Sequence, residues 1–361
     1  MNIIIFLILG FLTSLLFPPY FFIPIGFIIF PILCFYTGHK FNKSPIKKTI
    51  IPIFCFGLTF FGSLLFWLVN PFFVFDETKN YFFLTIFLII FLSIIFTIIF
   101  IFIFSLRNYL PSLIIIPLVF IFTEYFISIF FYGFPWITFS LIISSNDHLL
   151  FFIKNYGTFI TSYAVIQVLC FPYIFIFMKN FKQNIKFISY FLFLPLFFGI
   201  FIKTIFNNQE TDLKKNIQVE IFQLNFQNTV DAFELQNRSN IIIESINKSN
   251  SDLLIFAENN YPYLVRNLSL NEIQQNIKKN QTVIIGGTRF DKNNYYNTLF
   301  SINFSKISYF DKQILVPFGE FLPLRNFLSF MIPITGPSDY SEGNNSRLID
   351  INDNLSFIPV I

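Results

Sequence analysis

Long apolar runs fill the first part of the chain, and shorter apolar runs separated by polar residues fill the rest. A helix needs roughly 17–25 mostly apolar residues to cross the hydrocarbon core of a bilayer. Runs of about that length predict membrane helices near residues 2–17, 21–37, 49–69, 81–106, 111–131, 157–178 and 186–206. Since the first run has no basic residue before it and no small-residue cleavage site after it, we interpret it as a membrane helix rather than a signal peptide. The pattern thus predicts a membrane domain, residues 1–206, of about seven transmembrane helices.

Basic residues gather in alternate loops of this first part. They follow the second, fourth and sixth runs, as Lys40, Lys43, Lys47 and Lys48, then Arg107, then Lys179, Lys182 and Lys186. Loops on the cytoplasmic side carry the excess of Lys and Arg. We therefore expect the N-terminus inside and the second part of the chain outside, which in a bacterium with two membranes is the periplasmic side of the inner membrane. An even number of crossings would reverse this orientation.

The second part, residues 216–361, has a different pattern. Short apolar segments at 218–225, 252–258 and 282–286 are bounded by polar residues or glycine, as is typical of strands. Between the first two, residues 231–249 are polar with apolar positions at helical spacing. Strand alternating with helix predicts an α/β domain. The expected fold is an α-helical membrane bundle followed by an α/β domain.

Composition narrows the possible functions. The chain is 55% hydrophobic and 12% charged, which excludes an ordinary soluble protein, and a formal charge of +4 is too small to suggest a nucleic-acid partner. Two histidines, and three cysteines without a CxxC motif, argue against a disulfide framework and a zinc site, and we expect no metal or organic cofactor. A transporter or channel remains a rival interpretation, although the first 206 residues show no internal duplication.

Two segments of the second part could carry chemistry. Glu258 follows the apolar segment that begins at Asp252, and ligands of open α/β sheets bind at the carboxyl ends of such strands. Lys312 leads into an apolar segment that we expect to be a strand, stopped by Pro317-Phe-Gly and followed by Glu320. A lysine held near carboxylates can donate hydrogen bonds to a developing oxyanion. A solvent-facing acid and an exposed surface lysine are the alternatives without function.

Two further candidates lie in the first part. Trp136 ends the Gly-Phe-Pro-Trp segment that begins at Gly133, in an expected outer loop. A tryptophan at a membrane boundary needs no catalytic explanation. Glu124 is an acid within the fifth apolar run, which makes it a functional candidate by default, although we favour a structural hydrogen-bonding role.

Taken together, these segments resemble a known superfamily. The stretch Ala-Glu258-Asn-Asn-Tyr-Pro262, the glycines 286 and 287, and the block from Lys312 to Glu320 are similar to the nitrilase (carbon-nitrogen hydrolase) superfamily. With the preceding membrane runs and the segment ending at Trp136, the whole chain resembles the bacterial apolipoprotein N-acyltransferases. The resemblance implies a nitrilase-type α/β/β/α sandwich after the membrane bundle. One departure is Ala257, where members commonly have proline.

The resemblance also implies roles and substrates. Glu258 matches the general base, Lys312 the oxyanion-stabilising lysine, Glu320 a supporting carboxylate, and Trp136 a residue near the opening for lipid. The implied reaction begins when a cysteine thiolate takes an acyl chain from a phospholipid as a thioester. The acyl chain then passes to the N-terminal amine of the S-diacylglyceryl-cysteine of an apolipoprotein. Another membrane-tethered nitrilase-type amidase would share the same residues, so that only the substrate separates the two readings.

The nucleophilic cysteine of this mechanism is missing. Cys34, Cys55 and Cys170 all lie in apolar runs, and no cysteine follows them. In the family, the cysteine ends a strand that corresponds to residues 354–361. The chain stops at the point where that cysteine would be expected. We therefore expect the domain at 216–361 to be C-terminally truncated and the chain as given to be inactive. A fragment or frameshifted gene, a split protein and a non-catalytic relic are the three explanations.

Overall fold

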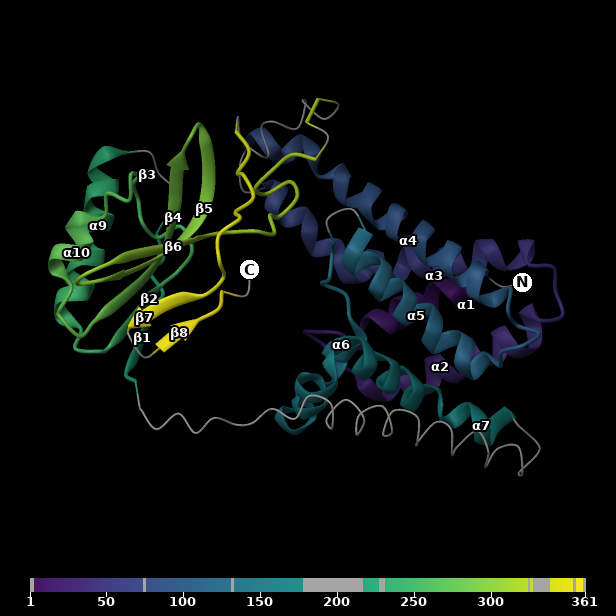
Figure 1. Cartoon of the computed structure of the whole chain (residues 1–361). Helices are drawn as coiled ribbons and strands as arrows, with labels where there is room; N and C mark the ends of the chain where they lie inside the picture. Colours follow the sequence, from purple (N-terminus) through teal and green to yellow (C-terminus); the bar gives the residue numbers. More distant parts are fainter. Residues whose placement is uncertain are drawn as a thin grey trace. The chain divides into compact units, whose positions relative to one another are not determined.

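A computed structural model describes residues 3–73, 76–130, 133–177, 217–226, 231–323, 325–326, 338–352 and 355–359. The chain divides into two compact units, Met1–Gln209 and Glu210–Ile361, whose elements are labelled in Figure 1. The first unit is helical and the second is built on a β-sheet. The expected combination of a membrane bundle and a sheet domain is confirmed.

The helices of the first unit follow the predicted apolar runs. They are α1 (Ile3–Ser14), α2 (Gly26–Phe35), α3 (Lys47–Leu65), α4 (Phe83–Phe104), α5 (Ser112–Ile129), α6 (Asp147–Cys170) and α7 (Pro172–Phe177). Short turns of other helix types extend several of them: η1 (Ile23–Ile25), η2 (Tyr36–Phe41), η3 (Phe66–Phe73), η4 (Asp76–Tyr81) and η6 (Phe139–Ile143).

Among the described residues, five helical stretches are long and apolar enough to cross a membrane. They are Ile23–Phe41, Lys47–Phe73, Thr78–Phe104, Ser112–Ile129 and Asp147–Phe177. The predicted first run is a helix of only 12 residues. The predicted seventh run, residues 186–206, lies outside the described residues. The last of the five stretches bends at Gly157, whose φ of 75° is not helical.

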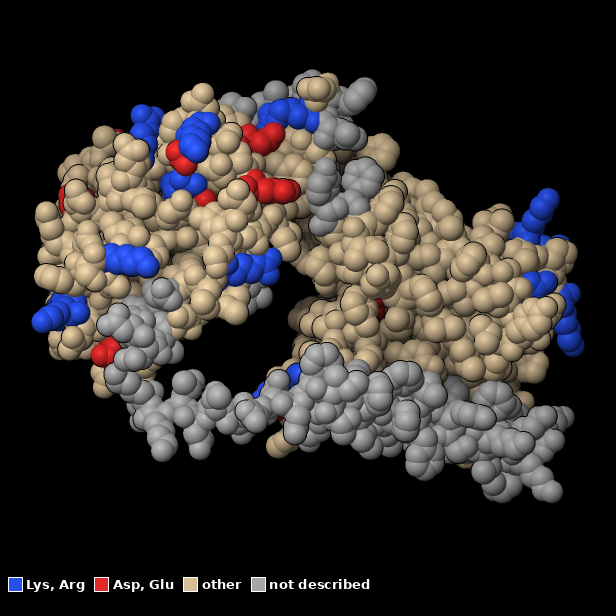
Figure 2. Space-filling view, viewed as in Figure 1, with Lys and Arg blue, Asp and Glu red and all other residues tan. Residues whose placement is uncertain are grey.

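Phenylalanine forms much of the core of this unit. Phe60, Phe120 and Phe139, from three different segments, pack with ring centroids 4.8–6.4 Å apart. The apolar side chains on the outside, such as Phe102 at 72% exposed, suit a lipid environment. In Figure 2 the visible face of this unit is almost free of charged side chains, except where Lys and Arg gather at one end.

In its described residues, the second unit is built on a six-stranded mixed sheet. Its strands are β1 (Val219–Phe222), β2 (Leu253–Phe256), β3 (Val265–Arg266), β4 (Thr282–Asp291), β5 (Asn294–Asn303) and β6 (Ile307–Asp311). The order is β1-β2-β4-β5-β6, with β3 also paired to β4. β1, β2 and β3 run parallel to their neighbours, whereas β4, β5 and β6 form an antiparallel meander. A separate hairpin joins β7 (Ile349–Asn352) to β8 (Leu355–Phe357).

Helices α9 (Ala232–Lys248) and α10 (Asn271–Asn276) cover one face of this sheet. Ile246 of α9 and Ile273 of α10 share a buried cluster with Leu254 and Phe256 of β2. Because side chains alternate along a strand, Leu253 and Ile255 point to the other face, where Phe357 packs near them. The predicted strands at 218–225, 252–258 and 282–286 and the helix within 231–249 are thus confirmed.

One expected element is wrong. The sequence suggested a strand after Lys312, but the strand is β6, which ends at Asp311, and the segment that follows is irregular. Among the residues that the structure describes, residues 313–316 have no partner strand, and Ile314 and Val316 are 62% and 48% exposed. An apolar run without a neighbouring edge to pair with cannot form a ladder, and Pro317 removes one donor.

Candidate functional site

Three of the four predicted site residues meet in the second unit. The Nζ atom of Lys312 lies 3.0 Å from Oε1 of Glu320 and 3.7 Å from Oε1 of Glu258. The side chains of Lys312 and Glu320 are 11% and 10% exposed, whereas that of Glu258 is 56% exposed. The lysine is therefore nearly buried between an inner carboxylate and an outer one that solvent reaches.

Asn297 joins this group, although it was not among the candidates selected from the sequence. Its Nδ2 atom donates to Oε1 of Glu258 and to Oε1 of Glu320, each at 2.5 Å. Its backbone carbonyl accepts from the backbone N–H of Lys312 at 2.8 Å. Asn297 is a buried amide within β5, and its role becomes visible only once the register of β5 and β6 brings these residues together. The signal in the sequence was one polar residue in a strand, which is too common to be selective.

A tight turn after β2 holds Glu258. Asn259 has a φ of 53°, in the left-handed region, and the side chain of Asn260 accepts from the backbone N–H of Ala257 at 3.1 Å. β4 passes close to this turn at Gly286. A Cβ atom there would lie 2.7 Å from Cα of Glu258, so only glycine fits without moving the turn.

Glu320 is fixed by the loop that it closes. Its Oε2 atom accepts from the backbone N–H of Val316 at 2.7 Å, and its own N–H donates to the carbonyl of Val316 at 2.9 Å. Between them Phe318 has a φ of 62°, which is strained for a bulky side chain. The carbonyl of Glu320 also accepts from the backbone N–H of Tyr340 at 2.8 Å. The inner carboxylate is thus a structural part of its loop as well as a partner of Lys312.

An ion pair joins two segments that follow this loop in the chain. Arg325 donates to both carboxylate oxygens of Asp339, through Nε at 2.8 Å and through Nη2. The backbone N–H of Leu322 donates to the same carboxylate at 2.9 Å. The hydrogen bond from Arg325 favours the ionised form and lowers the pKa of Asp339, although burial acts in the opposite direction.

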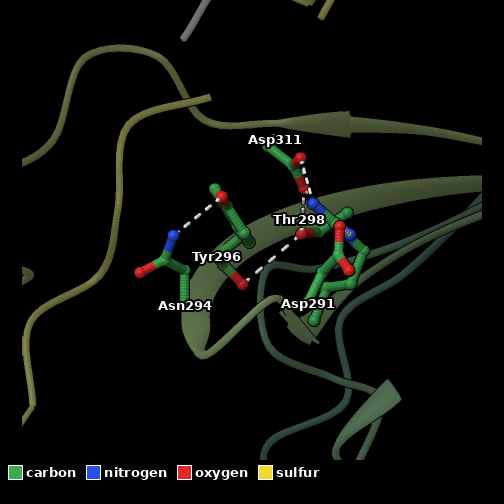
Figure 3. Close-up of polar contacts among 6 residues, drawn as sticks. Asp291, Asn294, Tyr296, Thr298 and Asp311 are labelled. Atoms are coloured by element: carbon green, nitrogen blue, oxygen red, sulfur yellow. Dashed lines mark hydrogen bonds and ion pairs between the residues drawn. The ribbon is translucent and has the colours of Figure 1, made fainter. Parts of the chain in front are cut away.

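A second ion pair lies under the site, on the other face of the same strands. Arg289 of β4 donates to Asp311 of β6 through Nε at 3.0 Å and Nη2 at 2.6 Å, and its guanidinium lies between the rings of Tyr296 and Tyr309. Thr298 of β5 donates to the same carboxylate at 2.6 Å, as Figure 3 shows. Burial opposes the charge of Arg289, but Asp311 outweighs it and raises the pKa of that guanidinium.

This cluster has a direct structural consequence for the site. Thr298 directly follows Asn297 in the chain, and Asp311 directly precedes Lys312. Successive side chains on a strand point to opposite faces. Arg289 and Thr298 both bind Asp311 and so hold β4, β5 and β6 in register on one face, while the side chains of Asn297 and Lys312 project from the other face. The site combines an accessible carboxylate, a nearly buried cation and rigid support. That set can accept a proton from a nucleophile and stabilise a negatively charged oxygen.

The remaining candidates lie in the first unit. Trp136 is 53% exposed, and Glu124 is buried in α5 at 5% exposed. Cys34 lies in α2, Cys55 in α3 and Cys170 in α6, so none of the three thiols belongs to the unit that contains Glu258 and Lys312. Within the part of the chain that the structure describes, no group of His, Cys, Asp and Glu is arranged to hold a metal ion.

Comparison with known proteins gives one consistent result. Residues 9–171 match the family model described as the apolipoprotein N-acyltransferase N-terminal domain. A Helicobacter pylori apolipoprotein N-acyltransferase is 30% identical over 165 residues, which is 43% of this chain and 39% of the relative. A Rickettsia prowazekii apolipoprotein N-acyltransferase is 27% identical over 375 aligned positions, covering 99% of this chain and 74% of the relative.

The extent of these matches differs along the chain. The chain spans about two fifths of the Helicobacter pylori relative and 24% of a Brucella suis relative with the same name, which is 28% identical over 127 residues. The family model ends at residue 171, before the second unit begins. The Rickettsia prowazekii match extends over the segments that contain Glu258, Lys312 and Glu320. The resemblance seen in the sequence is therefore confirmed.

Proposed function

We propose that this chain, whose sequence is similar to the apolipoprotein N-acyltransferases, carries the acid–base and oxyanion-binding part of an acyl-transfer site for lipoproteins. The observation that carries the proposal is the contact of Lys312 with Glu320 at 3.0 Å and with Glu258 at 3.7 Å. The proposed acyl donor is a phospholipid, and the proposed acceptor is the N-terminal amine of a diacylated apolipoprotein.

In the first proposed step, Glu258 removes the proton of a cysteine thiol, and the thiolate attacks the carbonyl carbon of the phospholipid ester. The side chain of Glu258 is 56% exposed and so can be reached by another group. The carbonyl oxygen becomes negatively charged, and the ammonium of Lys312 donates a hydrogen bond to it. The carbon–oxygen bond then breaks, the departing glycerol oxygen takes the proton back from Glu258, and a thioester remains.

The second proposed step mirrors the first. The amine of the acceptor attacks the thioester carbonyl, again opposite Lys312, and Glu258 takes a proton from the nitrogen. The carbon–sulfur bond breaks, which releases the thiolate and leaves an amide on the lipoprotein. Asn297 and Glu320 do not move protons in this scheme. They support the scheme because Asn297 joins both carboxylates and Glu320 lies 3.0 Å from the lysine.

The thiol of this scheme is not supplied by the second unit of the given sequence. The three cysteines are at positions 34, 55 and 170, all in apolar helices. We therefore propose that these 361 residues alone transfer no acyl chain, and that the thiol comes from a segment corresponding to the uncovered part of the relatives. We further propose that the site faces the periplasm beside the inner membrane, and that Trp136 contacts the lipid.

The test is a chimera. This chain replaces the aligned part of the Rickettsia prowazekii relative, whose remaining segment is retained. With phosphatidylethanolamine and a diacylated lipopeptide, the chimera should acylate the peptide amine and the 361-residue chain should not. Turnover by the 361-residue chain would contradict the proposed source of the thiol. A chimera that folds and hydrolyses small amides, but never acylates the lipopeptide, would favour a membrane-tethered nitrilase-type amidase.

A further inference from the structure

The two tryptophans of the chain stack on each other. Trp67 belongs to η3 at the end of α3, and Trp136 lies in the segment that follows α5. Their ring centroids are 5.5 Å apart with an interplanar angle of 13°, and Phe134 packs against Trp136 at 4.9 Å. The two residues are 48% and 53% exposed. An indole pair that remains half exposed is a surface feature rather than part of the core.

The pair lies where two membrane-crossing stretches end. α3, α4 and α5 are consecutive, and α4 packs against both of the others. Consecutive crossings alternate in direction, so α3 and α5 end on the same side of the bilayer. Tryptophan is enriched at the boundary between membrane and water, where the indole contacts lipid near its head group. The place of the pair in the topology therefore favours a phospholipid as the molecule that it contacts.

The segment that carries Trp136 is fastened at its beginning by the end of α5. Gly133 has a φ of 80°, and a Cβ atom there would lie 2.4 Å from the carbonyl oxygen of Ser128. The backbone N–H of Phe134 donates to the carbonyl of Ile127 at 2.7 Å. Only glycine allows the chain to turn back this sharply, which fixes the direction in which the segment leaves the helix.

Glu124 fastens the other end of the segment. Its Oε1 atom accepts from the backbone N–H of Phe139 at 2.7 Å, and its Oε2 atom accepts from the hydroxyl of Thr138 at 3.1 Å. Ser162 of α6 joins the same network, because its Oγ lies 2.9 Å from Oγ1 of Thr138 and accepts from the backbone N–H of Ser140 at 2.8 Å. Both carboxylate oxygens thus bind residues that follow Trp136 within three positions.

The apolar surroundings of Glu124 would make its carboxylate strongly unfavourable without these hydrogen bonds. Glu124 is 5% exposed and borders a cavity of about 10 Å³, lined by Phe60, Phe120, Phe139 and other apolar residues. A carboxylate in such a place is retained only where it makes specific hydrogen bonds. By contrast, the neighbouring Thr123 donates to the carbonyl of Val119 within its own helix, at 2.7 Å. Glu124 therefore accepts hydrogen bonds from the segment that follows Trp136 and not from its own helix, α5.

We propose that Glu124 is a positioning residue that holds Trp136 against Trp67, and that both indoles together form the surface that meets the phospholipid. Trp67 thereby becomes the second half of the lipid contact, on a helix remote in sequence. The part of the inference that concerns lipid rests on the proposed acyl transfer. The part that concerns Glu124 and the indole pair stands without it.

The first test measures the pair itself. Since the chain has two tryptophans, stacked indoles should give a coupled near-ultraviolet circular dichroism signal that is lost in Trp67→Phe and in Trp136→Phe. Glu124→Leu should lose the same signal, Glu124→Gln should retain most of it, and Thr123→Val should retain all of it. If Glu124→Leu does not fold, Thr138→Val takes its place in the test. It removes one of the two donors to Glu124 and should weaken the signal. An unchanged signal in Glu124→Leu or, in that case, in Thr138→Val would overturn the positioning role.

The second test measures the lipid contact in vesicles of phosphatidylcholine that contain a minor fraction of brominated phosphatidylethanolamine. Selective contact predicts tryptophan quenching greater than the mole fraction of the brominated lipid, with the excess lost in Glu124→Leu and kept in Thr123→Val. Quenching in proportion to the mole fraction would overturn the lipid part of the inference. Neither test needs enzymatic turnover, so both results can be interpreted even if the proposed function is wrong.

Discussion

Asn297 gives the sharpest test of how the site is assembled. It is 6% exposed and donates to Glu258 and Glu320, so Asn297→Leu removes both hydrogen bonds while roughly keeping the volume. A hydrogen bond to a charged group contributes about 1.5–3 kcal/mol. The bond to Glu258 contributes little, because that carboxylate is 56% exposed and regains water when the amide is lost. The bond to Glu320 counts in full, since its side chain is 10% exposed.

The expected loss is therefore about 1.5–3 kcal/mol rather than twice that amount. If local opening governs exchange, amides of β5 and β6 should exchange hydrogen roughly 10- to 150-fold faster, as followed by mass spectrometry on the whole chain. Asn294→Leu is the matched control, because Asn294 lies on the same strand, is exposed, and makes one long contact of 3.5 Å to Tyr296. Its effect should stay within about 0.5 kcal/mol. Equal effects of the two substitutions would refute the reasoning.

Three other predictions follow. Gly286→Ala should place a Cβ atom 2.7 Å from Cα of Glu258 and displace this proposed base, which lowers acyl transfer by the chimera roughly a hundredfold. Asp311→Ala should leave the buried Arg289 without its main partner and destabilise the second unit by about 3–5 kcal/mol, measured by hydrogen exchange. The lowered pKa of Asp339 means that its ion pair stabilises the fold above the unfolded pKa of about 3.9 and that this stabilisation is lost as the pH falls through the folded value. Pepsin should therefore cleave the segments around that pair faster as the pH is lowered, and Asp339→Asn should remove this pH dependence.

For each of these three predictions, a specific result would contradict it. Gly62→Ala is the control for the glycine, because the nearest atom to its Cβ would be a side-chain carbon at 3.8 Å. If both glycine variants lose the same activity, the close approach is not the cause. A loss below about 1 kcal/mol in Asp311→Ala would mean that the ion pair does not hold the strands. Equal sensitivity to pepsin at all acidic pH values would exclude the role assigned to Asp339.

The sequence predicted the two units because their signals are strong. Long uninterrupted apolar runs have few other structural explanations, and the strands around Leu254 and Val283 are bounded by clear polar punctuation. Glu258 and Lys312 could be selected because they lie in motifs that resemble a superfamily. The irregular segment after Lys312 could not be predicted, since an apolar pattern does not reveal whether a neighbouring strand edge is available.

The residues that support the site and the tryptophan pair could not be selected from the sequence, for a different reason. Asn297 and Arg289 matter through partners on other strands, and those partners depend on a register that the sequence does not state. Trp67 had no motif of its own, and only the packing of α3, α4 and α5 brings it to Trp136. Glu124 could be noticed as an acid in an apolar run, but its partners in the loop could not be inferred.

The most direct measurement of the central claim is thioester formation in the chimera, followed by mass spectrometry after mixing with phosphatidylethanolamine alone. If Glu258 is the base, Glu258→Gln should accumulate no thioester, whereas Glu342→Gln, which removes an exposed carboxylate of the same unit, should accumulate the normal amount. Lys312→Met should slow formation strongly, and Lys279→Met should not. Normal thioester formation by Glu258→Gln would contradict the claim that these residues form the acyl-transfer site.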